Sequence, residues 1–230
     1  MYPYATRHPG RQSAVVFDCD GLLISTQSAW DRAYAQLAMR YGKRLTSRDR
    51  HALVGLQLEA LGHALAELLG HPAPPLQLAT EVYDMVRDGA GNGHTPMPGA
   101  ISLVTALHGT RPLAVASNTP RQIVAAYLQD AGILNAFDAI ICSDQVSCPK
   151  PAPDIYLAAC KALRRDPGEC LALEDSPTGA IAALAAGLYL IGIPSATDLL
   201  FPAHQHAATL NDRTLWQSLG LTPSRLHPGR

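Results

Sequence analysis

The chain has 230 residues, 47% of them hydrophobic, and a formal net charge of −1. This length can bury a sizeable core and fits either one domain or a core with a modest insert. This near-zero charge excludes a general attraction to nucleic acid or to an anionic membrane, and no apolar stretch approaches the roughly 18 residues of a membrane helix. We therefore expect a soluble, cytoplasmic protein that binds a small molecule and neither nucleic acid nor a membrane.

The predicted elements alternate between short apolar strands and longer helices. Alternation of this kind implies crossover connections and a parallel sheet, so the fold class expected is α/β, with a Rossmann-like core and helices on both faces. In chain order we expect a strand at 14–17, a helix at 98–108, a strand at 113–116, a helix at 120–131, a strand at 139–142, a helix at 153–163, a strand at 170–173, a helix at 177–186 and a strand at 188–193. An edge element and a last helix are expected after Pro202.

One long stretch interrupts the alternation. Residues 26–89 show several helical patterns and no good strand, and the glycines and prolines of GAGNGHTPMPG follow. We predict a helical cap at 26–89, inserted into a core formed by 1–25 and 90–230. Its two connections could act as hinges of a lid that controls substrate choice. The alternative is that these helices belong to one continuous core.

The five cysteines carry no metal-binding or disulfide pattern. Their number is odd and no CxxC pair occurs. A disulfide framework and a structural zinc site are both disfavoured, and we expect the cysteines to be reduced and structural.

Polar residues follow three of the predicted strands. They are Asp18 and Asp20 in FDCDG, Ser117-Asn118 in ASN, and Glu174-Asp175 in LEDSPTG. The carboxyl ends of parallel strands form the usual ligand site of such a sheet. Each pair alone is more often turn or capping chemistry than catalysis. Their joint occurrence, in order along the chain, favours a functional site.

Two helices are predicted to begin directly beside these polar pairs. In SNTPRQ, Thr119 can be the N-cap, Pro120 the first helical residue and Gln122 the partner in a capping box. In EDSPTG, Ser176 and Pro177 repeat the first two roles. Free N–H groups at helix starts favour anions such as phosphate.

Four carboxylates at one edge need a cation among them. Like charges that close repel strongly, and oxygen ligands without nearby His or Cys favour Mg²⁺. Lys150, which lies between two prolines in CPKPAPDIY, could balance the remaining negative charge and bind a phosphate. The alternative for Lys150 is an ordinary exposed lysine.

This set of motifs resembles the haloacid dehalogenase superfamily. FDCDG is similar to its first motif, ASN to its second, the lysine of KPAPDIY to its third, and LEDSPTGAIAALAAG to its fourth, in the family order. The helical insert after the first motif and the EDSPTG sequence most resemble the β-phosphoglucomutase and small-phosphatase branch. One departure is Ser25-Thr26-Gln27, where that branch commonly has Asp-Ser/Thr-Glu, which leaves the substrate in question more than the chemistry.

The resemblance implies a role for each motif residue. Asp18 would be the nucleophile and Asp20 the general acid and base. The phosphoryl group or substrate would be bound by Gly21, Ser117, Asn118 and Lys150. The Mg²⁺ cofactor would be held by Asp18, the Asp20 main-chain carbonyl and Asp175, with Glu174 beside them.

The function expected from this resemblance is a magnesium-dependent phosphatase. It would hydrolyse a small phosphorylated metabolite, such as a sugar phosphate, through an aspartyl-phosphate. The alternatives are a phosphosugar mutase and a non-catalytic metabolite-binding protein on the same fold, and the protein could be a monomer or a dimer.

Within the insert we expect Trp30 in the core and most basic residues in solvent, although some could face the leaving group: Arg32, Arg40, Lys43, Arg44, Arg48 and Arg50.

Overall fold

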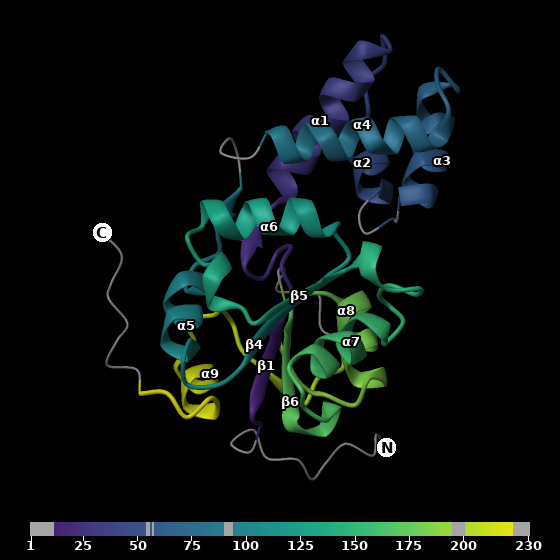
Figure 1. Ribbon diagram of the computed structural model, residues 1–230. Helices are drawn as coiled ribbons and strands as arrows, with labels where there is room; N and C mark the ends of the chain where they lie inside the picture. The colour runs from purple at the N-terminus through teal and green to yellow at the C-terminus, as the bar shows by residue number, and fades with distance from the viewer. Residues whose placement is uncertain (1–11, 54–55, 57, 90–93, 195–200, 223–230) are drawn as a thin grey trace. The chain divides into compact units, whose positions relative to one another are not determined.

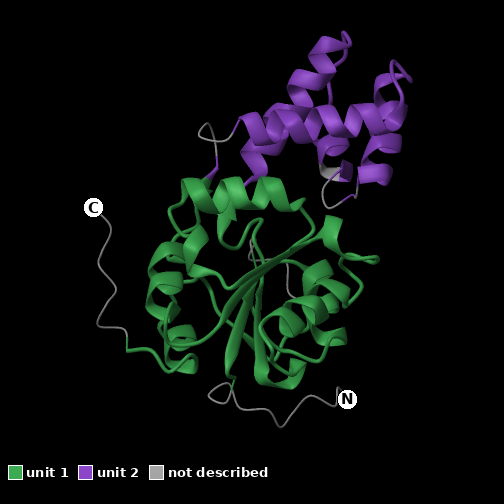
Figure 2. Cartoon of the chain, in the orientation of Figure 1, with its two compact units in different colours: residues 1–25, 95–230 green, residues 26–94 purple. Residues whose placement is uncertain are grey.

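The computed structural model describes residues 12–53, 56, 58–89, 94–194 and 201–222 (Figure 1). The chain divides into two compact units (Figure 2). We call residues up to Ser25 together with Thr95 onward the core unit, and Thr26–His94 the helical insert. The sequence predicts an insert that ends at Gly89, whereas the compact unit ends at His94. Residues 90–93 of the predicted linker lie outside the described residues.

The core unit contains a six-stranded sheet in the order β5-β4-β1-β6-β7-β8. Every neighbouring pair in it is parallel, which confirms the predicted Rossmann-like α/β class. The strands are β1 (Ala14–Phe17), β4 (Leu113–Ser117), β5 (Ala139–Cys142), β6 (Cys170–Glu174), β7 (Tyr189–Gly192) and β8 (Gln205–His206). The edge element expected after Pro202 is therefore present as β8.

Helices cover both faces of this sheet. Helices α5 (Ala100–Leu107) and α6 (Arg121–Asp130) lie on one face, and α7 (Asp154–Ala162) and α8 (Pro177–Ala185) on the other (Figure 1). The last helix, α9, spans Arg213–Ser218. Short 3₁₀ turns complete the core unit: η2 (Leu134–Ala136), η3 (Ser143–Gln145) and η4 (Pro167–Glu169).

Small side chains line the sheet face that packs on α7 and α8. Strand residues point alternately to opposite faces, so every second residue of a strand contributes to this face. Its buried cluster includes Ala14, Val16, Ala114, Ala116 and Ala172. Their small volume lets α7 and α8 pack close to the strands.

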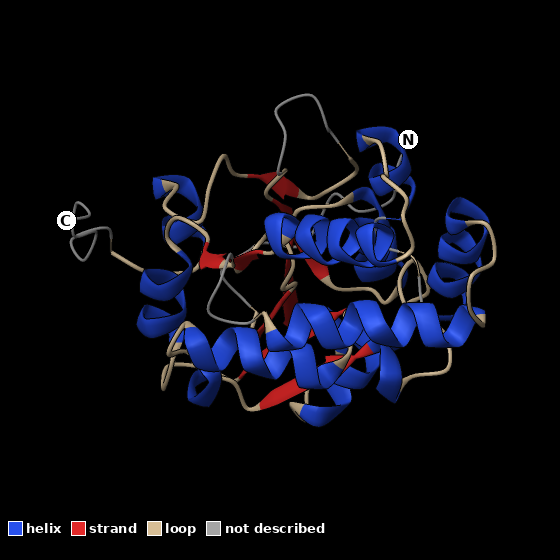
Figure 3. Ribbon diagram, turned by 90° about the horizontal axis from the view of Figure 1, so that it is seen from above, coloured by secondary structure: helices blue, strands red, loops and turns tan. Residues whose placement is uncertain are grey.

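A two-stranded sheet is a feature that the sequence analysis missed. β2 (Ile24–Ser25) pairs antiparallel with β3 (Thr95–Pro96) at the two ends of the insert. Two residues per strand are too short to show an alternating pattern, and a proline rarely signals a strand. All strands among the described residues, red in Figure 3, belong to the core unit.

The cap predicted for α6 is wrong in detail. Helix α6 begins at Arg121, and its N-cap residue is Pro120 in place of Thr119. The Arg121 N–H donates to the Asp144 carboxylate at 3.1 Å, and the Thr119 N–H donates to the Ser117 hydroxyl. The cap predicted for α8 is confirmed, since the Ser176 side chain accepts from the Gly179 N–H.

The helical insert has a core of its own. Its helices are α1 (Gln27–Arg40), α2 (Ser47–Leu53), α3 (Leu58–Leu69) and α4 (Pro75–Asp88). Trp30, expected in this core, is only half-buried and lies against the rings of Tyr34 and Tyr83, with centroids 6.0 and 5.7 Å away.

Some of the basic residues in the insert are paired within it. Arg40 forms an ion pair with Glu81 and Arg50 one with Asp31. The other basic residues named from the sequence are exposed: Arg32, Lys43, Arg44 and Arg48.

The cysteines are all free, and four of the five are buried. In the part of the chain that the structure describes, no helix combines the length and the apolar character needed to cross a bilayer.

Candidate active site

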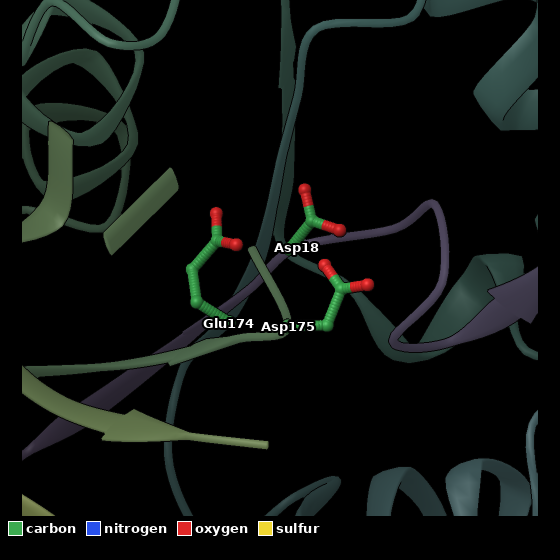
Figure 4. Close-up of side chains that lie close together, drawn as sticks. All are labelled: Asp18, Glu174 and Asp175. Atoms are coloured by element: carbon green, nitrogen blue, oxygen red, sulfur yellow. The ribbon is translucent and has the colours of Figure 1, made fainter. Parts of the chain in front are cut away.

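The carboxyl ends of β1, β4 and β6 bring the predicted polar residues together. β1 pairs with β6 so that Phe17 lies opposite Leu173, and the Asp18 N–H donates to the Leu173 carbonyl at 3.0 Å. Asp18 therefore lies beside Glu174, the last residue of β6, and Asp175 follows at once. Figure 4 shows the three carboxyl groups gathered at this edge.

Strand alternation directs two of these carboxylates toward α7. Asp18 continues the row of Ala14 and Val16, and Glu174 continues the row of Cys170 and Ala172. Both rows face the side of the sheet that α7 and α8 cover. The segment that leads into α7 carries Lys150, which reaches the same place.

The Lys150 ammonium group lies at the centre of the site. Its Nζ donates to Asp18 Oδ1 at 2.6 Å, to Glu174 Oε1 at 2.6 Å and to the Ala116 carbonyl at 2.7 Å. These three acceptors use all three of its protons. Although the side chain is only 4% exposed and burial alone would lower its pKa, the two carboxylates raise the pKa of Lys150 above its ordinary value. The lysine therefore stays charged.

Asn118 anchors the main chain at Lys150. Its Oδ1 accepts from the Lys150 N–H at 2.9 Å, and its Nδ2 donates to the Lys150 carbonyl at 3.0 Å. The side-chain amide that the sequence analysis assigned to phosphate binding thus holds the lysine segment beside β4. A contact of Asn118 with phosphate stays a prediction.

Glu174 is fully buried and accepts hydrogen bonds on both carboxylate oxygens. Oε1 accepts from Lys150 Nζ and from the Tyr156 hydroxyl, each at 2.6 Å. Oε2 accepts from the Ser176 hydroxyl at 3.2 Å and from the Ser176 N–H at 3.4 Å. On the side of α8 it contacts Gly179, where a Cβ atom would overlap the carboxylate.

Asp20 lies in the loop after β1 and is linked to β4. Its Oδ2 accepts from the Ser117 hydroxyl at 2.9 Å, and that hydroxyl in turn accepts from the Thr119 N–H. Asp20 Oδ1 is buried and has no hydrogen-bond partner among the described residues. One carboxylate oxygen of Asp20 is therefore held in place by a hydrogen bond, while the other is buried without one in the described part of the chain.

Gly21 allows the loop after Asp20 to pass close to Asp175. Its φ of +86° lies in the left-handed region, and a Cβ atom there would overlap the Asp175 carboxylate. Its N–H already donates to the Ile24 carbonyl at 2.8 Å. The direct role of Gly21 is thus to make room for Asp175, and a contact with substrate stays a prediction.

The carboxylates of the site outnumber the positive charges that could balance them. Ligand oxygens of Asp18, Glu174 and Asp175 lie within 4.8 Å of one another, with Lys150 as their only cationic hydrogen-bond donor among the described residues. Burial raises the pKa of Asp18 well above its usual range in spite of Lys150. Burial and the neighbouring Glu174 raise the pKa of Asp175 to about 7.

A divalent cation would supply the missing charge. Mg²⁺ binds to carboxylate oxygens and keeps several waters, and the donors gathered here are oxygen atoms. The charge deficit and the spacing of the carboxylates therefore fit this ion.

Three contributors to the site were not predicted from the sequence. Tyr156 lies within the quoted KPAPDIY motif, six residues after Lys150, and its position on the buried face of α7 could have indicated a role. Gly179 is a glycine inside a helix, which is unfavourable by propensity and thus suggests close packing. The carbonyl of Ala116 has no sequence signal, because every residue carries one.

Comparison with known proteins finds similar hydrolases. A family model of the haloacid dehalogenase-like hydrolases matches residues 12–187. The chain is 30% identical over 183 residues to the fructose-1-phosphate phosphatase YqaB of Escherichia coli strain K12, covering 80% of this chain and 97% of that protein. It is 31% identical over 185 residues to the validoxylamine A 7'-phosphate phosphatase of Streptomyces hygroscopicus subsp. limoneus, covering 80% and 86%. CbbY from Rhodobacter sphaeroides, solved in complex with phosphate, matches with a TM-score of 0.77 at 26% identity, over 86% of this chain and 95% of its own.

The contact between Gly179 and Glu174 predicts an unusual stability effect. Alanine in place of a helical glycine normally stabilises a protein by up to about 1 kcal/mol. Here the added methyl group overlaps a fully buried carboxylate, and we expect Gly179→Ala to lower the free energy of unfolding by about 2 kcal/mol, as overpacking does. Urea denaturation followed by circular dichroism measures this change.

Thr178→Ala is the matched control, because Thr178 is the exposed neighbour in α8. It should change the free energy of unfolding by less than about 0.5 kcal/mol. A stabilised Gly179→Ala variant would contradict the observed packing of α8 on Glu174.

Proposed function

This chain belongs to the haloacid dehalogenase-like hydrolases and is a phosphoric monoester hydrolase, and from that membership we propose a magnesium-dependent phosphatase that forms an aspartyl-phosphate. The observation that carries the proposal is the 2.6 Å contact between Lys150 Nζ and Asp18 Oδ1 beside Asp175. It joins an acid that can attack phosphorus to a cation that can accept the phosphate charge.

Asp18 is the proposed nucleophile and Asp20 the proton carrier. An Asp18 oxygen forms a bond to phosphorus while the bond from phosphorus to the leaving-group oxygen breaks. Protonated Asp20 gives its proton to that leaving oxygen, and its buried Oδ1 is the atom without another partner among the described residues. In the second step Asp20 takes a proton from water, whose oxygen attacks phosphorus and releases phosphate and Asp18.

The remaining residues reduce the repulsion between the two anions. We propose that Lys150 and Ser117 bind the transferring phosphoryl group, whose oxygens would replace one of the acceptors that each donor has without substrate. Asp18, Asp175 and the Asp20 main-chain carbonyl would hold Mg²⁺. The bound ion would neutralise phosphate oxygens and polarise the phosphorus.

We propose a role for Glu174 that differs from the metal-ligand role suggested by its motif. Donors from Lys150, Tyr156 and Ser176 already occupy both of its oxygens. We therefore assign it first to holding Lys150. A further bond to the metal would have to compete with these donors.

The proposed substrate is a small phosphorylated metabolite of the sugar-phosphate type. Support comes from the relatives, which are named as phosphatases of fructose 1-phosphate and of validoxylamine A 7'-phosphate.

We also propose that the helical insert, which begins directly after β2, is a cap that selects the leaving group. The phosphatase names favour hydrolysis over the phosphosugar mutase.

The nucleophile is tested by Asp18→Asn. The amide keeps the shape of the side chain but is a far poorer nucleophile and metal ligand, so hydrolysis of p-nitrophenyl phosphate should fall by several powers of ten. Circular dichroism should show that the variant is folded.

Asp130→Asn at the exposed end of α6 is the control for loss of one carboxylate, and it should retain wild-type activity. Appreciable turnover by a clean preparation of Asp18→Asn would remove Asp18 from the nucleophile role.

A screen of phosphorylated metabolites for released phosphate tests both the metal and the reaction. EDTA should abolish release, Mg²⁺ should restore it, and Ca²⁺ should support it poorly because its larger, irregular coordination shell fits in-line attack badly. Full activity after exhaustive chelation would refute the magnesium assignment. Isomerised sugar phosphate without free phosphate would instead identify a mutase.

A further inference from the structure

Tyr156 contacts both charged partners at the centre of the site. It is the third residue of α7 and is fully buried. Its hydroxyl donates to Glu174 Oε1 at 2.6 Å, and its ring centroid lies 5.1 Å from Lys150 Nζ. The face of an aromatic ring attracts a cation at this distance. One side chain thus supports the glutamate and the lysine together.

The Tyr156 hydroxyl completes the set of donors around Glu174. A carboxylate has about four lone-pair positions, and the donors here come from Lys150, from Tyr156 and twice from Ser176. Gly179 closes the side toward α8, where no further atom would fit. Each of these contacts restricts rotation of the Glu174 carboxylate.

The position of Lys150 Nζ depends on how firmly Glu174 is held. A lysine has a flexible stem of four carbons, so its ammonium group is placed by its acceptors rather than by the stem. One of the three acceptors, the Ala116 carbonyl, is a main-chain atom of β4, whereas Asp18 Oδ1 and Glu174 Oε1 are side-chain oxygens. Of these two, Glu174 Oε1 also accepts a hydrogen bond from the Tyr156 hydroxyl.

The hydroxyl of Tyr156 stays protonated and so acts only as a donor. Burial, reinforced by the negative charge of Glu174, raises the pKa of Tyr156 well above its ordinary value. A neutral donor stabilises the Glu174 carboxylate and adds no charge to the site. Phenylalanine would fill the same space without that donor.

We propose that Tyr156 is a positioning residue, whose hydroxyl fixes Glu174 and thereby holds the Lys150 ammonium group against Asp18 and the phosphoryl group. The inference rests on the proposed function, since it concerns how a phosphate ester is turned over at that site. The rival explanation is that Tyr156 merely fills the core beneath the sheet. A change of the hydroxyl alone separates the two.

The test compares Tyr156→Phe with Tyr127→Phe. Tyr127 is also a fully buried tyrosine, but it lies in α6 on the opposite face of the sheet. With saturating Mg²⁺ and p-nitrophenyl phosphate, Tyr156→Phe should lower kcat by about tenfold, in line with loss of a hydrogen bond to a charged group. Inhibition by inorganic phosphate should weaken as well, because Lys150 is less well placed. Tyr127→Phe should leave both quantities within twofold of the wild type.

The hydrogen bond itself is observable without activity. Proton NMR of the wild type should contain a slowly exchanging, downfield hydroxyl signal that is absent from Tyr156→Phe and present in Tyr127→Phe. If Tyr156→Phe melts at a much lower temperature, the kinetic comparison is made where circular dichroism shows that both variants are folded.

A Tyr156→Phe enzyme with kcat and phosphate inhibition within twofold of the wild type would overturn the inference and leave a packing role. A wild-type protein that releases phosphate from no ester would instead contradict the proposed function. The two failures are therefore distinguishable, because the first requires an active wild type.

Discussion

The buried contact of Lys150 with Asp18 and Glu174 is the interaction on which the site depends. Carboxylates taken out of water repel one another, and each costs several kcal/mol unless it is paired and hydrogen-bonded. One ammonium group with three short contacts, 2.6 to 2.7 Å long, offsets part of this cost. The remainder appears as the raised pKa values of Asp18 and Asp175. That remaining charge deficit suits a divalent cation and the phosphate it would bring.

The fold supplies this contact through ordinary features of a parallel sheet. Alternation along β1 and β6 aims Asp18 and Glu174 at the same face, and small residues there let α7 and α8 pack close to the strands. Gly179 is unfavourable in a helix by propensity, yet it leaves room for Glu174. Local stability is thus given up where the site needs space, which is usual for functional regions of natural proteins.

The sequence could predict the fold class and the residues at the strand ends, because both follow from local patterns. The apolar runs of β1 and β5 matched the observed bounds, and Asp18, Lys150 and Glu174 stood in recognisable motifs. The partners of these residues could not be predicted in the same way. Thr119 bonds to Ser117 within one turn, where several hydrogen-bond acceptors compete. Asn118 holds the Lys150 main chain through a contact between segments that are distant in the sequence. The β2–β3 pair was too short to leave a pattern.

If Asp18 carries the phosphoryl group during turnover, the group can be trapped there. In Asp20→Ala, an activated ester such as p-nitrophenyl phosphate needs no acid for its leaving group, whereas hydrolysis of the aspartyl-phosphate lacks its base. The phosphorylated enzyme should therefore accumulate. Acid quenching, borohydride reduction and peptide mass spectrometry should find homoserine at position 18, and the Asp18→Asn/Asp20→Ala double variant should show none. Release of p-nitrophenol by Asp20→Ala with position 18 unmodified would show that Asp18 does not carry the phosphoryl group.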